Sequence, residues 1–241
     1  MKIRIKFRKY GTMKFIGHLD VMRYFQKAIR RADVDVCYSG GFSPHQIMSF
    51  AAPLGVGNTS NGEYVDIEVS STKDSETMKK CLNGVMSEGF EVVSYRGLPD
   101  DAANAMSIVG AGDYTLAFRP GYEPEDMDKE TWFQGLIAFF ERPSVMVTKK
   151  TKRGEKEMDL KPLVYELRIC PEGDGEMEGP RLFMKISAGS AANVKPEQVL
   201  DAYYGFLGKE RPPFAFMVQR EEVYADRASD AEKEAGIHSF I

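Results

Sequence analysis

Residues 2–8 alternate strictly between basic and apolar side chains, and this pattern constrains the fold more than any other feature of the sequence. The apolar positions are Ile3, Ile5 and Phe7, and the basic positions are Lys2, Arg4, Lys6 and Arg8. Because successive side chains of a strand point to opposite faces, the alternation predicts a half-buried strand with a basic outer face. Gly11 and Thr12 end this strand.

A helix is expected to follow, from about His18 to Ala32. Its apolar stripe is predicted at Leu19, Met22, Phe25 and Ile29. A second stripe is basic, because Arg23, Lys27 and Arg30 recur at helical spacing. Asp20 in the first turn suits the positive end of the helix dipole.

The rest of the first half completes a βαββαβ order. An apolar run at 47–54 precedes an alternating strand at 64–69, a helix at 75–87 with Asp74 as its N-cap, and a strand at 90–95. This is the order of a ferredoxin-like lobe, in which an antiparallel sheet carries both helices on one face.

The second half of the sequence repeats the same order of elements. Strands are expected at 114–119, 145–148, 163–170, 182–187 and 214–218, with helices after Asp128 and from Pro196. We therefore predict an α+β protein of two ferredoxin-like lobes in tandem. The lobes span residues 1–97 and 113–225, joined by a linker at 98–112 and followed by a polar tail at 226–241.

Charge is distributed unevenly along the chain. The net charge is −4, yet residues 1–31 hold ten basic residues and one acidic residue. This asymmetry favours a polyanionic partner for the N-terminal lobe.

The sequence also lacks a long apolar run and an apolar leader, so we expect a cytoplasmic protein without membrane attachment. Cys37, Cys81 and Cys170 are widely spaced, so no metal site or cofactor is expected.

Three segments carry a family resemblance. They are Phe15-Ile16-Gly17-His18-Leu19-Asp20, then Gly41-Phe42-Ser43-Pro44-His45 with Pro53-Leu54-Gly55 after it, and Thr151-Lys152-Arg153-Gly154 with Asp159-Leu160-Lys161-Pro162. Over most of residues 1–220 the chain resembles the radical SAM-linked proteins, a bacterial family of unknown function. The resemblance implies a helper of a radical SAM enzyme. Gln46 and Ile47 depart from the proline and lysine that typically follow this histidine in the family.

The first candidate site is the basic surface of the N-terminal lobe. An open sheet face with basic and aromatic groups is typical of RNA-binding sheets, so Lys2, Arg4, Lys6 and Arg8 are candidate RNA contacts, as are Arg23, Lys27 and Arg30. The alternative is a solvated face in which Asp66 and Glu68 lie opposite Arg4 and Lys6 as cross-strand pairs.

The second candidate site combines His18, Asp20 and His45, with Tyr38 and Ser43 nearby in the sequence. A neutral histidine near a helix N-terminus can act as a general base. The alternative is a structural role for both histidines.

The third candidate is a basic hairpin at 149–156 that includes Lys149, Lys150, Lys152 and Arg153. Such a hairpin can probe a nucleic acid, or carry lysine only to prevent edge pairing.

Together these patterns predict a non-catalytic protein that binds RNA, such as tRNA or rRNA, and presents it to a radical SAM partner. Two alternatives remain open. One is an RNA-processing or RNA-modifying enzyme that uses His18, Asp20 and His45. The other is a protein–protein adaptor that binds no nucleic acid.

Overall fold

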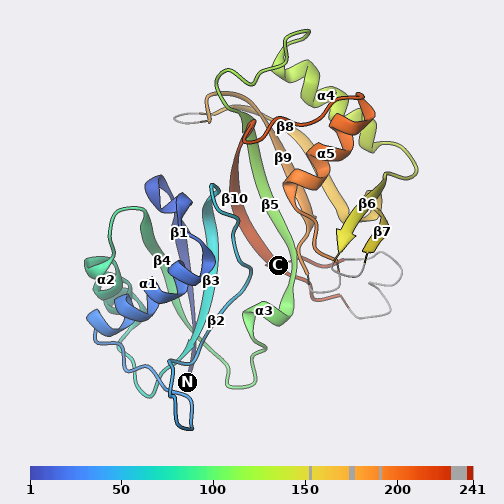
Figure 1. The fold of residues 1–241 in the computed structure, drawn as a ribbon. Helices are drawn as coiled ribbons and strands as arrows, with labels where there is room; N and C mark the ends of the chain where they lie inside the picture. Colours follow the sequence, from blue (N-terminus) through green and yellow to red (C-terminus); the bar gives the residue numbers. More distant parts are fainter. Residues whose placement is uncertain (152–153, 174–176, 190–191, 229–237, 241) are drawn as a thin grey trace. The chain divides into compact units, whose positions relative to one another are not determined.

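We analysed a computed structural model of the chain, which describes residues 1–151, 154–173, 177–189, 192–228 and 238–240. It is a mixed α+β structure whose sheets are mostly antiparallel (Figure 1). The chain forms two compact units, Met1–Val109 with Arg220–Arg227, and Gly110–Gln219 with Ala228–Phe240.

The first unit contains the elements expected from the N-terminal sequence. Its elements are β1 (Lys2–Lys9), η1 (Gly11–Phe15), α1 (His18–Arg31), β2 (Met48–Phe50), β3 (Thr59–Glu68), α2 (Ser75–Val85), β4 (Phe90–Leu98) and α3 (Ala105–Ile108). The strand order is β4-β1-β3, with β2 paired to β3. The β1–β3, β1–β4 and β2–β3 pairs are antiparallel.

Both long helices of this unit contribute to one core. Ile3, Ile5 and Phe7 of β1 pack with Phe25 of α1 and Leu82 of α2, and all five are at most 1% exposed. Figure 1 shows α1 and α2 next to each other. The alternation of residues 2–8 therefore has the predicted result: the apolar side chains face the helices and the basic ones face away.

The predicted apolar stripe of α1 is wrong at one end. Leu19 is 60% exposed, and the buried residues of the helix are Val21, Phe25, Ala28 and Ile29. These four positions lie at i, i+4, i+7 and i+8, which is one helix face. Leu19 falls outside that face.

The second unit contains β5 (Val109–Phe118), α4 (Lys129–Phe140), β6 (Met146–Thr151), β7 (Gly154–Asp159), η2 (Lys161–Leu163), β8 (Val164–Gly173), β9 (Gly179–Ser187), α5 (Pro196–Phe206) and the start of β10 (Phe216–Ala225). The strand order is β10-β5-β9-β8. Aromatic side chains dominate its core: the rings of Trp132 on α4 and Tyr203 on α5 are 4.9 Å apart, and Trp132 also contacts Phe118 and Phe216.

Two helix starts match the sequence signals. The side chain of Asp74 accepts a hydrogen bond from the Thr77 N–H, and that of Asp128 accepts one from the Thr131 N–H. These N-caps satisfy amides that the first helical turn leaves without a backbone partner. Pro196 is the first residue of α5, as expected from its fixed φ.

The chain crosses from one unit to the other at 109–110, at 219–220 and at 227–228. Residues 98–112, predicted as a linker, include α3 and the first residues of β5. The second crossing falls inside β10, which gives Phe216–Gln219 to the second unit and Arg220–Ala225 to the first. The predicted tail at 226–241 lies largely outside the described residues.

Candidate functional site

The basic side chains on the outer face of β1 all have partners within the first unit. Lys2 donates to the Ala102 carbonyl at 2.8 Å, Arg4 pairs with Asp66 at 2.8 Å, Lys6 pairs with Glu222, and Arg8 pairs with Glu91 at 3.1 Å. The hydrogen bond to Asp66 raises the pKa of Arg4. Three of these cations are therefore in ion pairs and Lys2 is bonded to a carbonyl, which lowers the attraction of this face for an external polyanion.

The cross-strand pairing of these residues was only half predicted. Arg4 lies opposite Asp66, as the sequence suggested. Lys6 lies opposite Tyr64, and Glu68 lies opposite Lys2, so the expected Lys6–Glu68 pair is wrong. The register between β1 and β3 determines which residues lie opposite each other. Lys6 instead forms its ion pair with Glu222, which is distant in the sequence.

The basic stripe of α1 remains on the surface. Arg23, Lys27 and Arg30 are all exposed. Arg23 lies 3.5 Å from Asp20, a long ion pair between largely exposed side chains. Within the described parts of the chain, Lys27 makes no ion pair. These side chains are thus available for new electrostatic contacts, unlike those of β1.

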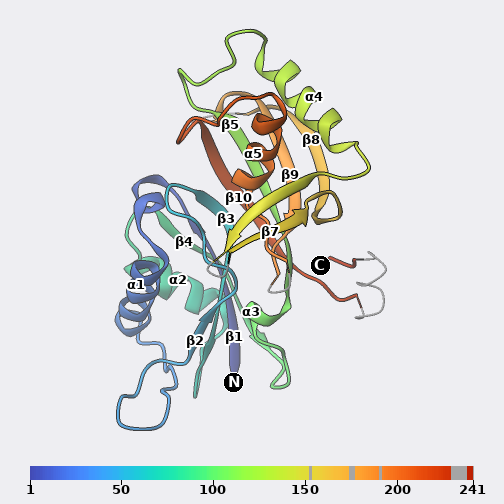
Figure 2. The same ribbon diagram turned by 45° about the vertical axis from the view of Figure 1, so that its right-hand side comes forward.

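A structured loop at 37–47 lies beside this stripe. Tyr38 and Gln46 form an isolated bridge, and the Ser39 N–H donates to the His45 carbonyl at 2.8 Å. The Ser39 hydroxyl also accepts from the His45 N–H and contacts His45 Nδ1 at 2.9 Å. Figure 2 shows this loop, in blue, extending from the first unit.

One backbone carbonyl connects the loop to the basic stripe. The oxygen of Gln26 on α1 accepts a hydrogen bond from Gln46 Nε2 at 3.2 Å and another from Arg30 Nε at 3.3 Å. Gln46 is 4% exposed, so this contact is inside the protein. The buried Gln46 side chain therefore anchors the loop next to the α1 turn that carries Arg30.

The loop exposes aromatic side chains. Phe42 is fully exposed at the turn and Tyr38 is 51% exposed. Their rings present large apolar surfaces to solvent, which is typical of contact residues rather than of a solvated loop. We call Arg23, Lys27, Arg30, Tyr38 and Phe42 the helix–loop surface.

The candidate catalytic residues have separate partners in the structure. The ring of His18 packs edge-on against Phe50 at 5.3 Å, Asp20 pairs with Arg23, and His45 bonds to Ser39. Ser43 is exposed on the loop. Among the described interactions, no hydrogen bond joins His18, Asp20 and His45 into a nucleophile–base arrangement.

A buried charge cluster escaped the sequence reasoning. Arg220 binds the Glu63 carboxylate with Nε at 2.8 Å and donates to the Ala52 carbonyl at 2.7 Å. Lys9 is 2% exposed and donates to the Ile16 carbonyl at 3.0 Å. Burial lowers the pKa of Lys9, while the nearby Glu63 charge raises it.

Only part of this cluster had a sequence signal. Lys9 is the next alternate residue after Ile3, Ile5 and Phe7, so its side chain falls on the same inner face of the strand. A buried cation on that face requires a polar partner. Nothing local links Glu63 to Arg220, because 157 residues separate them. Lys9 and Glu63, with His18 and Phe50, line a cavity of about 10 Å³, near the smallest that holds one water molecule.

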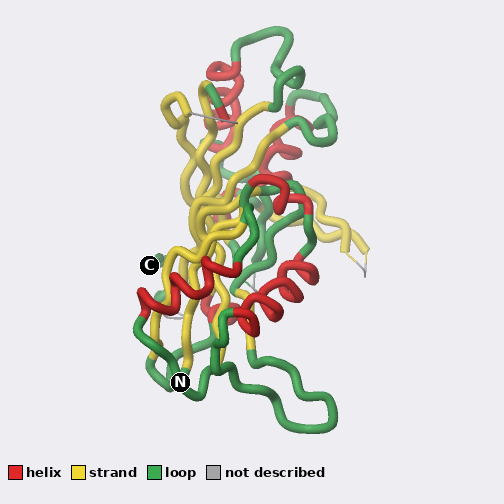
Figure 3. Tube along the Cα trace, turned by 90° about the vertical axis from the view of Figure 1, so that its left-hand side faces the viewer, coloured by secondary structure: helices red, strands yellow, loops and turns green. Residues whose placement is uncertain are grey.

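The basic hairpin forms in part as expected. β6 and β7 pair from Met146–Asp159 to Thr151–Gly154 and form a separate two-stranded sheet. Figure 3 shows the two strands running away from the other strands of their unit. Lys149 and Lys150 belong to β6, whereas Lys152 and Arg153 lie outside the described residues.

The described residues contain neither a metal-site arrangement nor a membrane-spanning helix. In the described part of the chain, no group of three or more His, Cys, Asp or Glu residues has the arrangement of a metal site. Among those same residues, no helix has the length and apolar character needed to cross a membrane.

The fold and surface define a class: an α+β protein whose first unit carries an exposed basic helix next to an aromatic loop. The chain belongs to the family described as "Uncharacterized protein conserved in bacteria (DUF2344)", whose model matches residues 2–196. A comparison with the curated proteins finds no match. The matched residues include α1 and the 37–47 loop, and they end before Arg220.

Proposed function

We propose that this protein binds RNA through the helix–loop surface and presents it to a radical SAM enzyme, without catalysing a reaction itself. One observation carries the proposal: the Gln26 carbonyl holds Arg30 and the anchor of the aromatic loop side by side. The buried anchor of the aromatic loop thereby lies beside the α1 turn that carries the exposed Arg30.

The chemistry of this surface suits RNA. Arginine and lysine side chains neutralise phosphates, and aromatic rings stack on unpaired bases. The proposed site lies on α1 and the loop, because the basic side chains on the outer face of β1 already have partners. We also propose that both units are ferredoxin-like lobes in tandem.

The radical SAM partner comes from the family resemblance. The chain has three widely spaced cysteines, at 37, 81 and 170, and lacks the cysteine motif that holds the iron–sulfur cluster of such enzymes. A role beside the enzyme fits this composition. Catalysis by His18, Asp20 and His45 is less well supported, because these side chains bind separate partners.

The test is fluorescence-anisotropy binding to bulk tRNA and to a single-stranded RNA across a salt titration. The variant Arg23→Glu/Lys27→Glu reverses two charges of the helix–loop surface. Its matched control is Lys73→Glu/Lys80→Glu, which reverses two exposed lysines elsewhere in the first unit. For single-stranded RNA, loss of two phosphate contacts lowers the slope of log affinity against log salt by roughly 1.4.

The aromatic part of the surface has a different signature. Phe42→Ala is expected to weaken single-stranded RNA binding by roughly 5- to 100-fold at every salt concentration, because stacking does not depend on counterions. Equal losses in the α1 variant and its control would contradict the proposed surface. No RNA binding at low salt would contradict the function and would favour a protein–protein adaptor.

A further inference from the structure

The second unit contains an open groove that the proposed function does not use. It lies between the C-terminal end of α4, the outer side of α5 and the start of β6, and its volume is about 540 Å³. Pockets that bind small molecules have volumes of roughly 300–1,000 Å³. The residues that line it include Phe139, Arg142, Met146, Gln198, Asp201 and Phe206.

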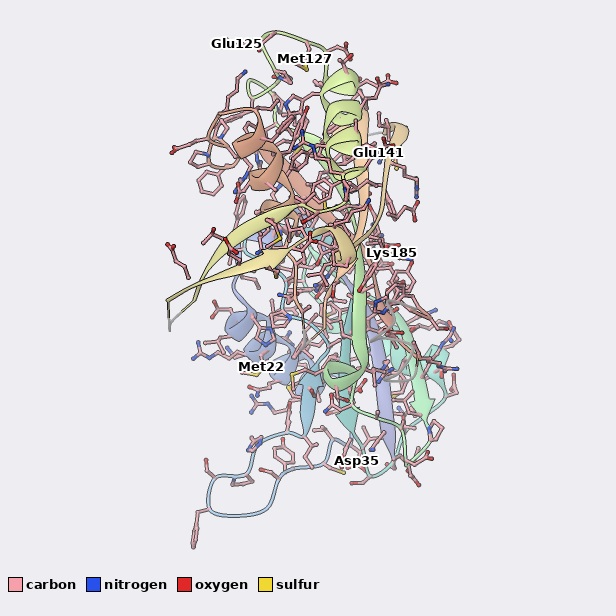
Figure 4. All side chains as sticks on the ribbon, turned by 90° about the vertical axis from the view of Figure 1, so that its right-hand side faces the viewer. Met22, Asp35, Glu125, Met127, Glu141 and Lys185 are labelled. Atoms are coloured by element: carbon pink, nitrogen blue, oxygen red, sulfur yellow. The ribbon has the colours of Figure 1, made fainter. Side chains whose placement is uncertain are left out.

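Arg142 is held against two aromatic rings at this groove. Its guanidinium carbon lies 4.1 Å from the ring centroid of Phe206 and 5.1 Å from that of Phe139. The two rings are 5.0 Å apart and stacked at 23°. Figure 4 marks the preceding residue, Glu141, at the end of α4. Stacking on the rings fixes the guanidinium plane, so its N–H groups are already oriented for an anion.

The positive charge of Arg142 is not cancelled within the groove. The carboxylate of Asp201 is 2.6 Å from Arg211, which occupies it. Among the described residues, Arg142 has no acidic partner. The Gln198 side-chain oxygen accepts from the Lys195 N–H at 3.0 Å, which leaves the amide nitrogen of Gln198 as a donor.

Apolar surface is exposed at the same place. Phe206 is 50% exposed and Met146 is 57% exposed. Large apolar side chains that remain in water next to an unpaired cation favour a ligand with both a flat apolar part and a negative charge.

We propose that this groove binds a nucleotide, with the base against Phe206 and the phosphate on Arg142. A guanidinium fork binds phosphate through two parallel hydrogen bonds, and an aromatic ring stacks on any base. The same chemistry is offered by a free nucleotide and by one residue of an RNA chain. The RNA source rests on the proposed function, whereas the free nucleotide does not.

The experiment uses the full chain in two arms. Saturation-transfer NMR titrations measure binding of 5′-AMP, and fluorescence anisotropy measures binding of a 12-nucleotide single-stranded RNA. Arg142→Gln removes the charge of an exposed side chain, and Phe206→Leu removes the stacking surface. The matched control is Arg168→Gln: Arg168 also lies over a phenylalanine ring, Phe183 at 3.9 Å, but is paired with Glu166 outside the groove.

We expect Arg142→Gln to weaken nucleotide binding roughly 10- to 100-fold, since it removes charge-assisted hydrogen bonds. Phe206→Leu should weaken it by a similar factor, and Arg168→Gln should leave it unchanged. A loss in the AMP arm identifies a free nucleotide as a ligand, and a loss in the RNA arm alone identifies a residue of a chain.

The two proposals fail separately. If Arg23→Glu/Lys27→Glu abolishes RNA binding while Arg142→Gln and Phe206→Leu change neither arm, the groove proposal is overturned and the proposed function stands. If no RNA binds but AMP binds through Arg142, the groove proposal stands and the proposed function is overturned. Unchanged fluorescence of Trp132, in the core of the second unit, shows that the Arg142→Gln and Phe206→Leu variants are folded.

Discussion

Replacing Arg220 by methionine tests the buried charge cluster directly, because methionine keeps an unbranched chain and removes the guanidinium. The side chains of Arg220 and Glu63 are only 3% and 7% exposed. The substitution removes the donors that bind the Glu63 carboxylate and the Ala52 carbonyl. A carboxylate would then remain inside the first unit without its main partner.

The expected cost follows from the burial of that carboxylate. Removing one partner of a buried ion pair destabilises a protein by about 3–5 kcal/mol. The ammonium of Lys9 interacts with the Glu63 charge and offsets part of this cost. We therefore expect a loss of about 3 kcal/mol for Arg220→Met, the lower end of the range.

Amide hydrogen exchange is the suitable assay, because it reports the stability of each segment. A loss of about 3 kcal/mol speeds exchange through unfolding by roughly 100-fold in β1 and β3. Trp132, the single tryptophan, is 3% exposed in the core of the second unit. Its fluorescence shows in the same sample that the second unit remains folded.

The matched control is Arg8→Met, since Arg8 pairs with Glu91 on the surface. Those side chains are 44% and 46% exposed, and exposed pairs contribute only about 0–1 kcal/mol. If Arg220→Met accelerates exchange no more than Arg8→Met, the buried pair does not stabilise the unit and the reasoning is refuted.

Three further predictions concern the same unit. Burial lowers the pKa of Lys9 below the unfolded value of 10.5. Between the folded and the unfolded pKa the unfolded chain binds more protons, so the free energy of unfolding should rise with pH up to about 10.5. Urea titrations at several pH values should show a smaller rise for Lys9→Met. Gly62→Ala should cost about 1–3 kcal/mol in thermal unfolding, because the new methyl group would lie 2.8 Å from the backbone of Glu222. Asp74→Ala should cost about 0.5–2 kcal/mol by loss of the N-cap to Thr77, and Asp74→Asn, which keeps a cap acceptor, should retain most of that stability in the same assay.

The local elements were predictable because their signals lie within a few residues of each other. The alternation of residues 2–8, the caps at Asp74 and Asp128, and Pro196 at the start of α5 all appear where expected. Each depends on the geometry of one strand or one helical turn, so neighbouring residues contain the information.

The candidate site was predictable only as a set of residues. The sequence identified the basic side chains of β1 and α1 together, but it did not separate those of β1 that pair with other strands from those that stay exposed on α1. That separation depends on Asp66, Glu91 and Glu222, which come from three other strands. The exposure of Phe42 and the anchoring of its loop by Gln46 also appear only in the folded chain.

By itself, the sequence determined the α+β class, the inner and outer faces of the first strand, and the helix that carries the basic stripe. Only the tertiary structure decided which charges are neutralised, because strand register sets each neighbour and a shift of one residue reverses the faces. It also brought Arg220 to Glu63 across 157 residues. Such a contact depends on the path of the whole chain, and no local pattern of side chains encodes it.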